Sequence, residues 1–148
     1  MPRKIEWFVF LLGLLSLAGW VVKAQQRTQE EQVVRQTIRR FWEAFGQRDA
    51  QGLQQVVHLP FLAVEVDEKG RTSTFFVVDE KMLRRECQEV EEPLRVEIAD
   101  LKVQMVGPEV AVATYTVKLP EERNAYRLVT MLAKKEKVWK IIATTIPM

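Results

Sequence analysis

The chain has 148 residues, 28% of them charged, and a formal net charge of +2 at pH 7. Three basic residues and one acidic residue within the first 24 positions account for that surplus, so residues 25–148 are close to neutral. A near-neutral domain with interspersed charges excludes the basic footprint that nucleic-acid binding requires, and its length suits one hydrophobic core. Cys87 and His58 are the sole cysteine and histidine. They can build neither an internal disulfide nor a usual zinc site, so we expect no metal and no cofactor.

The first 24 residues have the pattern of an export signal. Arg3 and Lys4 precede an apolar run over residues 7–22, and Val22-Lys23-Ala24 supplies small residues at its exit. A cationic start, an apolar centre and a small-x-small exit are typical of a signal peptide. We therefore expect cleavage after Ala24, or earlier within the chain after Ser16-Leu17-Ala18.

The alternative is a retained membrane anchor formed by residues 5–22. The apolar run has about 16 residues, just under the roughly 17–25 that span hydrocarbon. Trp7 and Trp20 lie near its two ends, where aromatic side chains favour the membrane interface. Both interpretations place residues 25–148 outside the cytoplasm, either exported (periplasmic or secreted) or anchored to the membrane.

Two helices are expected after this segment. Thr28 and, three residues later, Glu31 form a capping box, which predicts a helix start. Apolar residues then recur at helical spacing until Gly46 ends the helix, and Asp49 predicts the cap of a short second helix. The first apolar stripe comprises Val34, Ile38, Phe41, Trp42 and Phe45, and the second comprises Ala50, Leu53, Val56 and Val57.

A hairpin and a third helix are expected next. Residues 61–67 and 72–78 have strand character on either side of a polar turn. In the first of these strands, Leu62, Val64 and Val66 oppose a less apolar face made by Ala63, Glu65 and Asp67. Asp79 predicts the cap of a helix that Pro93 stops, with Met82, Leu83, Cys87 and Val90 turned inward.

Longer β segments complete the chain without a further helix. Residues 94–106 and 109–119 are expected to form one hairpin, and residues 124–135 and 138–146 another. Within the first of these strands, apolar residues occupy even positions before Ala99-Asp100 and odd positions after it. One extra residue resets which face points inward, so the pattern predicts a β-bulge that bends the sheet.

This order of elements indicates an α+β fold in which a curved antiparallel sheet wraps around N-terminal helices. Three motifs have a familiar order and spacing: Phe41-Trp42-Glu43-Ala44-Phe45 with Arg48-Asp49-Ala50, then His58-Leu59-Pro60-Phe61, then Val138-Trp139-Lys140-Ile141-Ile142. They resemble the nuclear transport factor 2-like superfamily, the cystatin-like cone fold shared by ketosteroid isomerase and SnoaL-like polyketide cyclases. The resemblance covers residues 28–146 and divides the chain into a targeting segment, 1–24, and one domain, 25–148. It implies a pocket between sheet and helices, but no particular reaction.

Three residues are candidates for acid–base catalysis. His58 titrates near neutral pH, but without a partner it can equally cap the second helix or hydrogen-bond the loop before Pro60. Glu65 or Asp67 would have a raised pKa inside an apolar cone and could abstract a proton, or either could be solvent-exposed beside the turn. Enzymes of the superfamily often carry acidic or histidine residues at the end of the last strand, where this chain has Ala143-Thr144-Thr145.

Four residues are candidates for ligand binding, namely Trp42, His58, Tyr115 and Tyr126. Tyr115 shares the apolar face of its strand with Ala113 and Val117. Its hydroxyl could donate to a ligand or be satisfied within the core. Tyr126 is adjacent to Arg127, so only one of the two can face the cone.

Two functions follow from these patterns. The first is an exported domain that binds a small, largely apolar molecule in the cone pocket, with weak acid–base activity of the isomerase or dehydratase type as an extension. The alternative is a membrane-tethered periplasmic scaffold or interaction module without catalysis. The resemblance also implies a homodimer paired through the outer sheet face, which carries Thr114, Thr116 and Lys118 and is expected to be polar.

Overall fold

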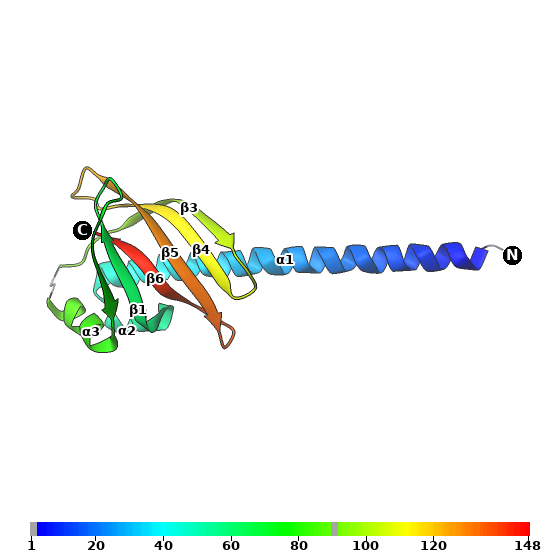
Figure 1. The fold of residues 1–148 in the computed structure, drawn as a ribbon, viewed down its shortest axis with the longest axis horizontal. Helices are drawn as coiled ribbons and strands as arrows, with labels where there is room; N and C mark the ends of the chain where they lie inside the picture. The colour runs from blue at the N-terminus through cyan, green and yellow to red at the C-terminus, as the bar shows by residue number, and fades with distance from the viewer. Residues whose placement is uncertain (1–2, 90–91) are drawn as a thin grey trace. The chain divides into compact units, whose positions relative to one another are not determined.

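The computed structural model of the chain describes residues 3–89 and 92–148, except for the side chains of residues 3–15 (Figure 1). Two compact units are present, Met1–Gln32 and Val33–Met148. Helix α1 (Arg3–Gln47) contributes residues to both units. In the described part of the chain, no helical stretch combines the length and the hydropathy needed to cross a membrane.

The expected helix start at Thr28 is wrong. Residues around it are helical on both sides, and the Thr28 hydroxyl donates a hydrogen bond to the Ala24 carbonyl at 3.0 Å, the bond of a threonine inside a helix. Lys23, Ala24 and the glutamines that follow are good helix formers, so nothing in this stretch ends the helix. The capping box therefore lies in the interior of α1.

Helices α2 (Ala50–Val56) and α3 (Glu80–Glu89) begin where their caps predict. The Asp49 carboxylate accepts a hydrogen bond from the Gly52 amide at 3.0 Å, and the Asp79 carboxylate accepts one from the Met82 amide at 2.8 Å. Val57, expected on the second helix, instead begins the first strand. The inward placement of Val90 lies outside the described residues.

Six strands form one sheet in the order β2-β1-β6-β5-β4-β3. Neighbouring strands are antiparallel except β1 and β6, which run parallel. The strands are β1 (Val57–Val66), β2 (Thr72–Val78), β3 (Glu97–Met105), β4 (Val110–Lys118), β5 (Ala125–Lys135) and β6 (Val138–Pro147). The C-terminal part of α1 packs against one face of this sheet (Figure 1). The α+β fold with a curved sheet around helices is confirmed.

The β-bulge expected at Ala99-Asp100 is confirmed. The pairing of β3 with β4 shifts register between Ala99 and Lys102, and Asp100 has a φ of 54°. One residue in the left-handed region is how an extra residue is accommodated in a strand. The face of β3 that points inward changes here, as the alternation of the sequence predicts.

Strand β1 presents the opposite face from the one its hydropathy suggests. Ala63 is 2% exposed and Leu62 is 40% exposed, so the face with Ala63 and Glu65 points toward the helices. The ladder with β2 then shifts register between Val64 and Val66, which leaves both Val66 and Asp67 buried. Expected solvent exposure of Asp67 is therefore wrong, because the bulge turns its side chain back onto the protein.

Candidate functional site

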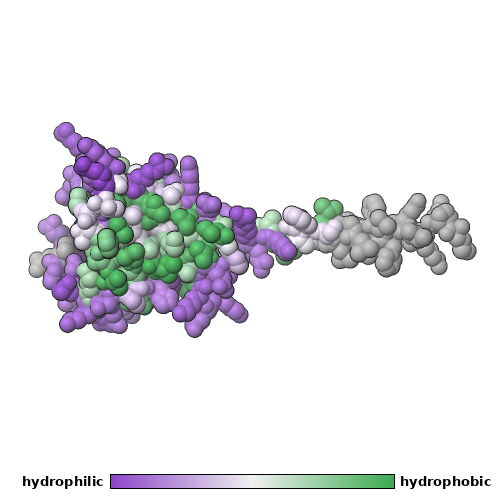
Figure 2. Space-filling view, in the orientation of Figure 1, coloured by the Kyte–Doolittle hydropathy of each residue, from purple (hydrophilic) through white to green (hydrophobic). Residues whose placement is uncertain are grey.

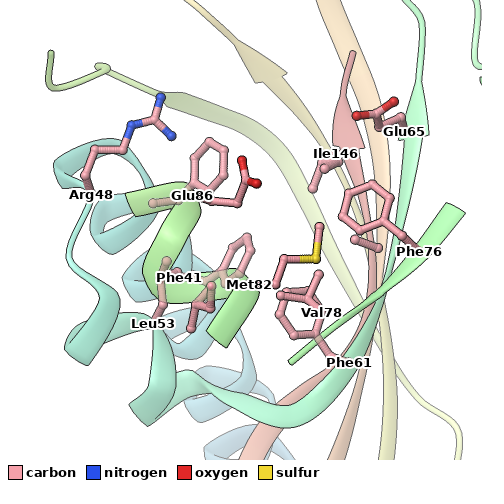
Figure 3. A pocket seen from close by; sticks show the side chains of 13 residues that line it. Phe41, Arg48, Leu53, Phe61, Glu65, Phe76, Val78, Met82, Glu86 and Ile146 are labelled. Carbon is pink, nitrogen blue, oxygen red and sulfur yellow. The ribbon is translucent and has the colours of Figure 1, made fainter. Parts of the chain in front are cut away.

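A cavity of about 340 Å³ lies between the sheet and the helices in the unit formed by residues 33–148. It is bordered by the C-terminal end of α1, by α2 and α3, and by β1, β2 and the end of β6, and it is partly open to solvent (Figure 3). Its apolar lining consists of Phe41, Phe45, Leu53, Phe61, Ala63, Phe76, Val78, Met82, Leu83 and Ile146. Three charged residues, Arg48, Glu65 and Glu86, complete the lining.

The apolar floor follows from regular spacing in the sequence. Phe41 and Phe45 are one helical turn apart on α1, and their rings stack with centroids 6.2 Å apart. Phe61 of β1 meets Phe41 edge-to-face at 6.5 Å. Ala63, two residues further along the same face of β1, is small, and the space it leaves is part of the cavity.

The charged side chains come from two sides of the cavity, with Arg48 and Glu86 on the helix side and Glu65 on the strand side near Phe76 (Figure 3). Glu65 comes from the inward face of β1 and accepts a hydrogen bond from the Ser73 hydroxyl at 3.2 Å. Glu86 comes from α3 and lies 3.5 Å from Arg85 in an exposed ion pair. The site therefore offers two carboxylates and one guanidinium at the edge of an apolar space.

Arg48 directly follows α1 and has a φ of 58°. Its guanidinium carbon lies 5.1 Å from the centroid of the Phe45 ring, and its Nε is buried and finds no hydrogen-bond partner among the described residues. Sequence patterns gave Arg48 no role beyond the family motif. One sequence feature could have identified Arg48: it occupies the first position after a helix that ends in aromatic residues, where glycine is the usual residue.

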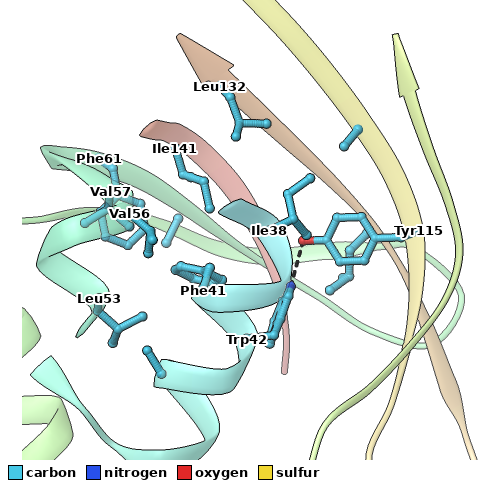
Figure 4. Close-up of a cluster of buried hydrophobic side chains, with 14 of the residues drawn as sticks. Ile38, Phe41, Trp42, Leu53, Val56, Val57, Phe61, Tyr115, Leu132 and Ile141 are labelled. Atoms are coloured by element: carbon cyan, nitrogen blue, oxygen red, sulfur yellow. Dashed lines mark hydrogen bonds between the residues drawn. The ribbon is translucent and has the colours of Figure 1, made fainter. Parts of the chain in front are cut away.

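Trp42 and Tyr115 lie in the core and do not line this cavity (Figure 4). The Trp42 indole donates to the Tyr115 hydroxyl at 2.9 Å, and that hydroxyl lies 2.6 Å from the Thr130 hydroxyl. Thr130 in turn lies 2.8 Å from Thr144. Burial raises the pKa of Tyr115, so it remains a neutral hydrogen-bonding group inside the core.

Tyr126 and Asp67 are also engaged within the protein. The Tyr126 hydroxyl donates to Glu122 at 2.6 Å, and this bond to a carboxylate raises the pKa of Tyr126 to about 12. Asp67 accepts hydrogen bonds from the amides of Lys69 and Arg71 at 2.9 and 2.8 Å and from the Arg71 guanidinium at 2.7 Å. The bonds from Arg71 lower the pKa of Asp67 although burial opposes them, so its carboxylate organises the β1–β2 turn as an anion.

His58 is half-buried in a shallow surface depression with Lys135, Glu136, Val138 and Lys140. Its Nε2 lies 3.4 Å from the Lys135 ammonium, and it does not line the cavity. Of the six candidate residues from the sequence, Glu65 is thus the one that the structure places at the cavity. The structure brings Trp42 and Tyr115 together in the core. His58 lies apart from both the cavity and the Trp42–Tyr115 pair.

Comparison with known proteins identifies the family. Residues 34–145 match the model of the SnoaL-like domain. A nuclear transport factor 2-like protein of unknown function from Shewanella baltica has a TM-score of 0.60 at 15% identity, over 80% of this chain and 92% of that one. A nuclear transport factor 2-like protein from Cytophaga hutchinsonii has a TM-score of 0.60 at 15% identity, over 78% and 94%.

A third solved structure, a nuclear transport factor 2-like protein of unknown function from Pseudomonas putida, has a TM-score of 0.60 at 18% identity, over 80% of this chain and 85% of that one. A search of curated proteins finds no match. At these identities the solved structures establish the fold and leave the ligand open. With its fold and the match over residues 34–145, the chain belongs to the SnoaL-like domain family of nuclear transport factor 2-like proteins.

Proposed function

We propose that this domain binds a small, largely apolar molecule in the cavity between α1, α3 and the sheet. The observation that carries the proposal is the cavity itself, with ten apolar residues and three charged ones lining about 340 Å³. Ligand sites usually have volumes of about 300–1,000 Å³ and combine an apolar wall with a few polar groups.

Glu65 is the group through which proton transfer on the bound molecule would run. It lines the cavity, whereas His58 and Asp67 lie elsewhere. One carboxylate beside an apolar ligand suffices for weak acid–base activity of the isomerase or dehydratase type. We therefore propose ligand binding as the main function and acid–base catalysis as an additional activity. Glu65→Gln would abolish that catalytic activity.

A pair of variants on adjacent residues of β1 tests the binding proposal. Ala63→Phe fills the cavity, and Leu62→Phe adds a similar ring to the opposite face of the same strand. Apolar carbonyl and sterol-like compounds are screened by thermal shift against the full chain, and affinities of the hits are then measured. We expect Ala63→Phe to abolish binding and Leu62→Phe to retain it. Equal affinity in a folded Ala63→Phe variant would contradict the proposal.

We further propose that the domain is exported, with residues 1–24 as its signal. The supporting observation is the cationic start, apolar run and Val22-Lys23-Ala24 exit. N-terminal sequencing of the protein recovered outside the cytoplasm tests this. A new terminus at Gln25 or Gly19 supports a cleaved signal, and an intact terminus on membrane-bound protein supports the tethered alternative.

The outer face of the sheet supports a second candidate function, an interaction surface that takes another copy of this chain. Two rows of outward side chains cross five strands, one through Leu62 and Met131 and the other through Val64 and Val129. The first row comprises Val77, Leu62, Ala143, Met131 and Val112. The second row comprises Phe75, Val64, Thr145, Val129 and Thr114. Figure 2 shows the hydrophobic patch that they form.

The extent of this patch is what favours a second copy. Phe75 is 75% exposed and Val77 is 62% exposed, Leu62, Met131 and Val129 are 40–45% exposed, and Val64 and Val112 are half-buried. A contiguous apolar patch of several hundred Å² is uncommon on monomers, and a standard interface buries about 800 Å² per partner. The expectation of a polar outer face was wrong: Thr114 and Thr116 do face outward, but Thr114 lies opposite Val129 of β5, and the polar pair of Thr116 with Arg127 lies beyond the apolar rows.

A further inference from the structure

The end of α1 places an arginine where glycine is the usual residue. The Arg48 amide donates to the Phe45 carbonyl at 3.2 Å and the Asp49 amide donates to the Ala44 carbonyl at 2.9 Å, the pair of bonds that closes a helix in a Schellman motif. In this motif the first residue after the helix takes a left-handed conformation. That residue is Arg48, which has a φ of 58°. A side chain at this position is disfavoured, and such strain concentrates at functional sites.

The Arg48 guanidinium has no anion of its own. Its Nε is buried without an acceptor, and among the described residues no carboxylate forms an ion pair with it. The two acids that line the same cavity interact elsewhere, Glu65 with Ser73 and Glu86 with Arg85. Burying this one N–H without an acceptor is costly, whereas the other N–H groups of the half-buried side chain are open to a ligand. A carboxylate ligand at these open N–H groups would give the guanidinium the anion that the described residues do not supply.

We propose that the cavity selects molecules with an apolar body and a single carboxylate, and that Arg48 binds the carboxylate. This inference rests on the proposed binding function. The guanidinium fork matches a carboxylate with two parallel hydrogen bonds, and packing on the Phe45 ring holds the fork in place. The body of the ligand then lies on the aromatic floor made by Phe41 and Phe61 (Figure 3).

Glu65 and Glu86 limit the ligand to one negative charge. Glu86 lies on the helix side of the cavity with Arg48, and Glu65 lies across from them on the strand side (Figure 3). A second carboxylate on the ligand would approach one of them, and like charges at close range raise the free energy of the complex. The site therefore favours a monoacid over a dicarboxylate of similar size.

Three related probes and four variants of the full chain test the inference by calorimetry, with indole as a neutral reference compound. The probes are 4-phenylbutyrate, its neutral amide 4-phenylbutanamide, and the dicarboxylate phenylsuccinate. We expect the acid to bind at least tenfold more tightly than the amide and phenylsuccinate to bind more weakly than the acid. Arg48→Gln should abolish the preference for the acid without changing the affinity of the amide, and Arg48→Lys should retain part of it. Arg40→Gln, an exposed arginine of α1 away from the cavity, should behave as the wild type.

Two results would overturn the inference in distinguishable ways. If acid and amide bind equally, or if a folded Arg48→Gln variant binds the acid as the wild type does, while Ala63→Phe still abolishes binding, the carboxylate subsite is wrong and the cavity remains a binding site. If none of the three probes binds the wild type and the neutral compound indole does not bind either, both the subsite and the binding function are wrong.

Discussion

The indole of Trp42 on α1 donates a hydrogen bond to the hydroxyl of Tyr115 on β4, across 2.9 Å and 73 positions of sequence. Both residues are at most 2% exposed. The bond fixes the helix against the sheet at the centre of the core, and the hydroxyl is also bonded to Thr130 (Figure 4). A pair of residues that first suggested a binding site is thus part of the structural core.

We expect Tyr115→Phe to destabilise the domain without changing ligand affinity. The substitution keeps the ring but leaves the buried Trp42 donor without its acceptor, which costs about 1–3 kcal/mol. Denaturant unfolding measures the loss, and calorimetry with a cavity ligand measures binding. Tyr126→Phe is the matched control, since the hydroxyl of Tyr126 bonds to Glu122 rather than to the core. A loss of affinity in Tyr115→Phe at unchanged stability would contradict the core assignment.

Stability should fall in acid partly through Asp67. Hydrogen bonds from Arg71 lower the pKa of this carboxyl below its ordinary value of 3.8. Its contribution to folding is therefore present above that ordinary value, and it is lost as the pH falls through the lower pKa of the folded state. In Asp67→Asn, the decline of the unfolding free energy below about pH 4 should be shallower than in the wild type.

The control for this measurement is Glu68→Gln, which removes an acid from the exposed neighbouring position. The unfolding free energy of this variant should fall in acid with the same slope as that of the wild type. If the unfolding free energies of Asp67→Asn and the wild type fell with the same slope in acid, the hydrogen bonds at the β1–β2 turn would not lower the pKa of Asp67 in the folded state relative to the unfolded state.

Gly46→Ala should destabilise the domain. A Cβ at this position would overlap the backbone carbonyl of Leu94, whose amide donates to the Gly46 carbonyl at 2.7 Å. Backbone on both sides cannot move aside cheaply, and overpacking of this kind costs about 1–3 kcal/mol. Gly107→Ala is the control because a Cβ there meets no atom within 4 Å. Equal denaturation midpoints for the two variants would mean that the segment before β3 is free to shift.

Association through the outer sheet face should depend on β2. We expect the wild type to sediment as a dimer at micromolar concentration and Phe75→Asp to sediment as a monomer, because a carboxylate would be desolvated in the interface. Thr74→Asp places the same charge on the other face of the same strand and should leave the dimer intact. A wild-type protein that remains monomeric at high micromolar concentration would reject the proposed pairing.

Local chemistry explains which elements could be predicted from the sequence. The caps at Asp49 and Asp79 and the bulge at Ala99-Asp100 depend on neighbouring residues, so the pattern alone specifies them. The inward face of β1 could not be predicted, since the outer face of the sheet is itself apolar and hydropathy no longer distinguishes the two. The start of α1 was misplaced because a capping box does not end the helix that precedes it.

The candidate site was less predictable because it is assembled from distant segments. Glu65 was identified as a carboxylate on the right strand, although its inward direction was not. Arg48 and Glu86 reach the cavity from the ends of two helices, and no spacing in the sequence relates them. Tyr115 and Trp42 were each correctly expected on an apolar face, but their mutual hydrogen bond follows only from the packing of α1 on β4.

The parallel pairing of β1 with β6 also constrains the order in which the domain can assemble. β6 lies between β1 and β5 in the sheet, yet it is the latest of the six strands along the chain. While a ribosome is still producing the chain, the β1–β2 hairpin has no neighbour to join it to the rest of the sheet. Contacts between such distant segments form slowly and late. The cavity, which Ile146 of β6 helps to line, is therefore completed only after the last strand has left the ribosome.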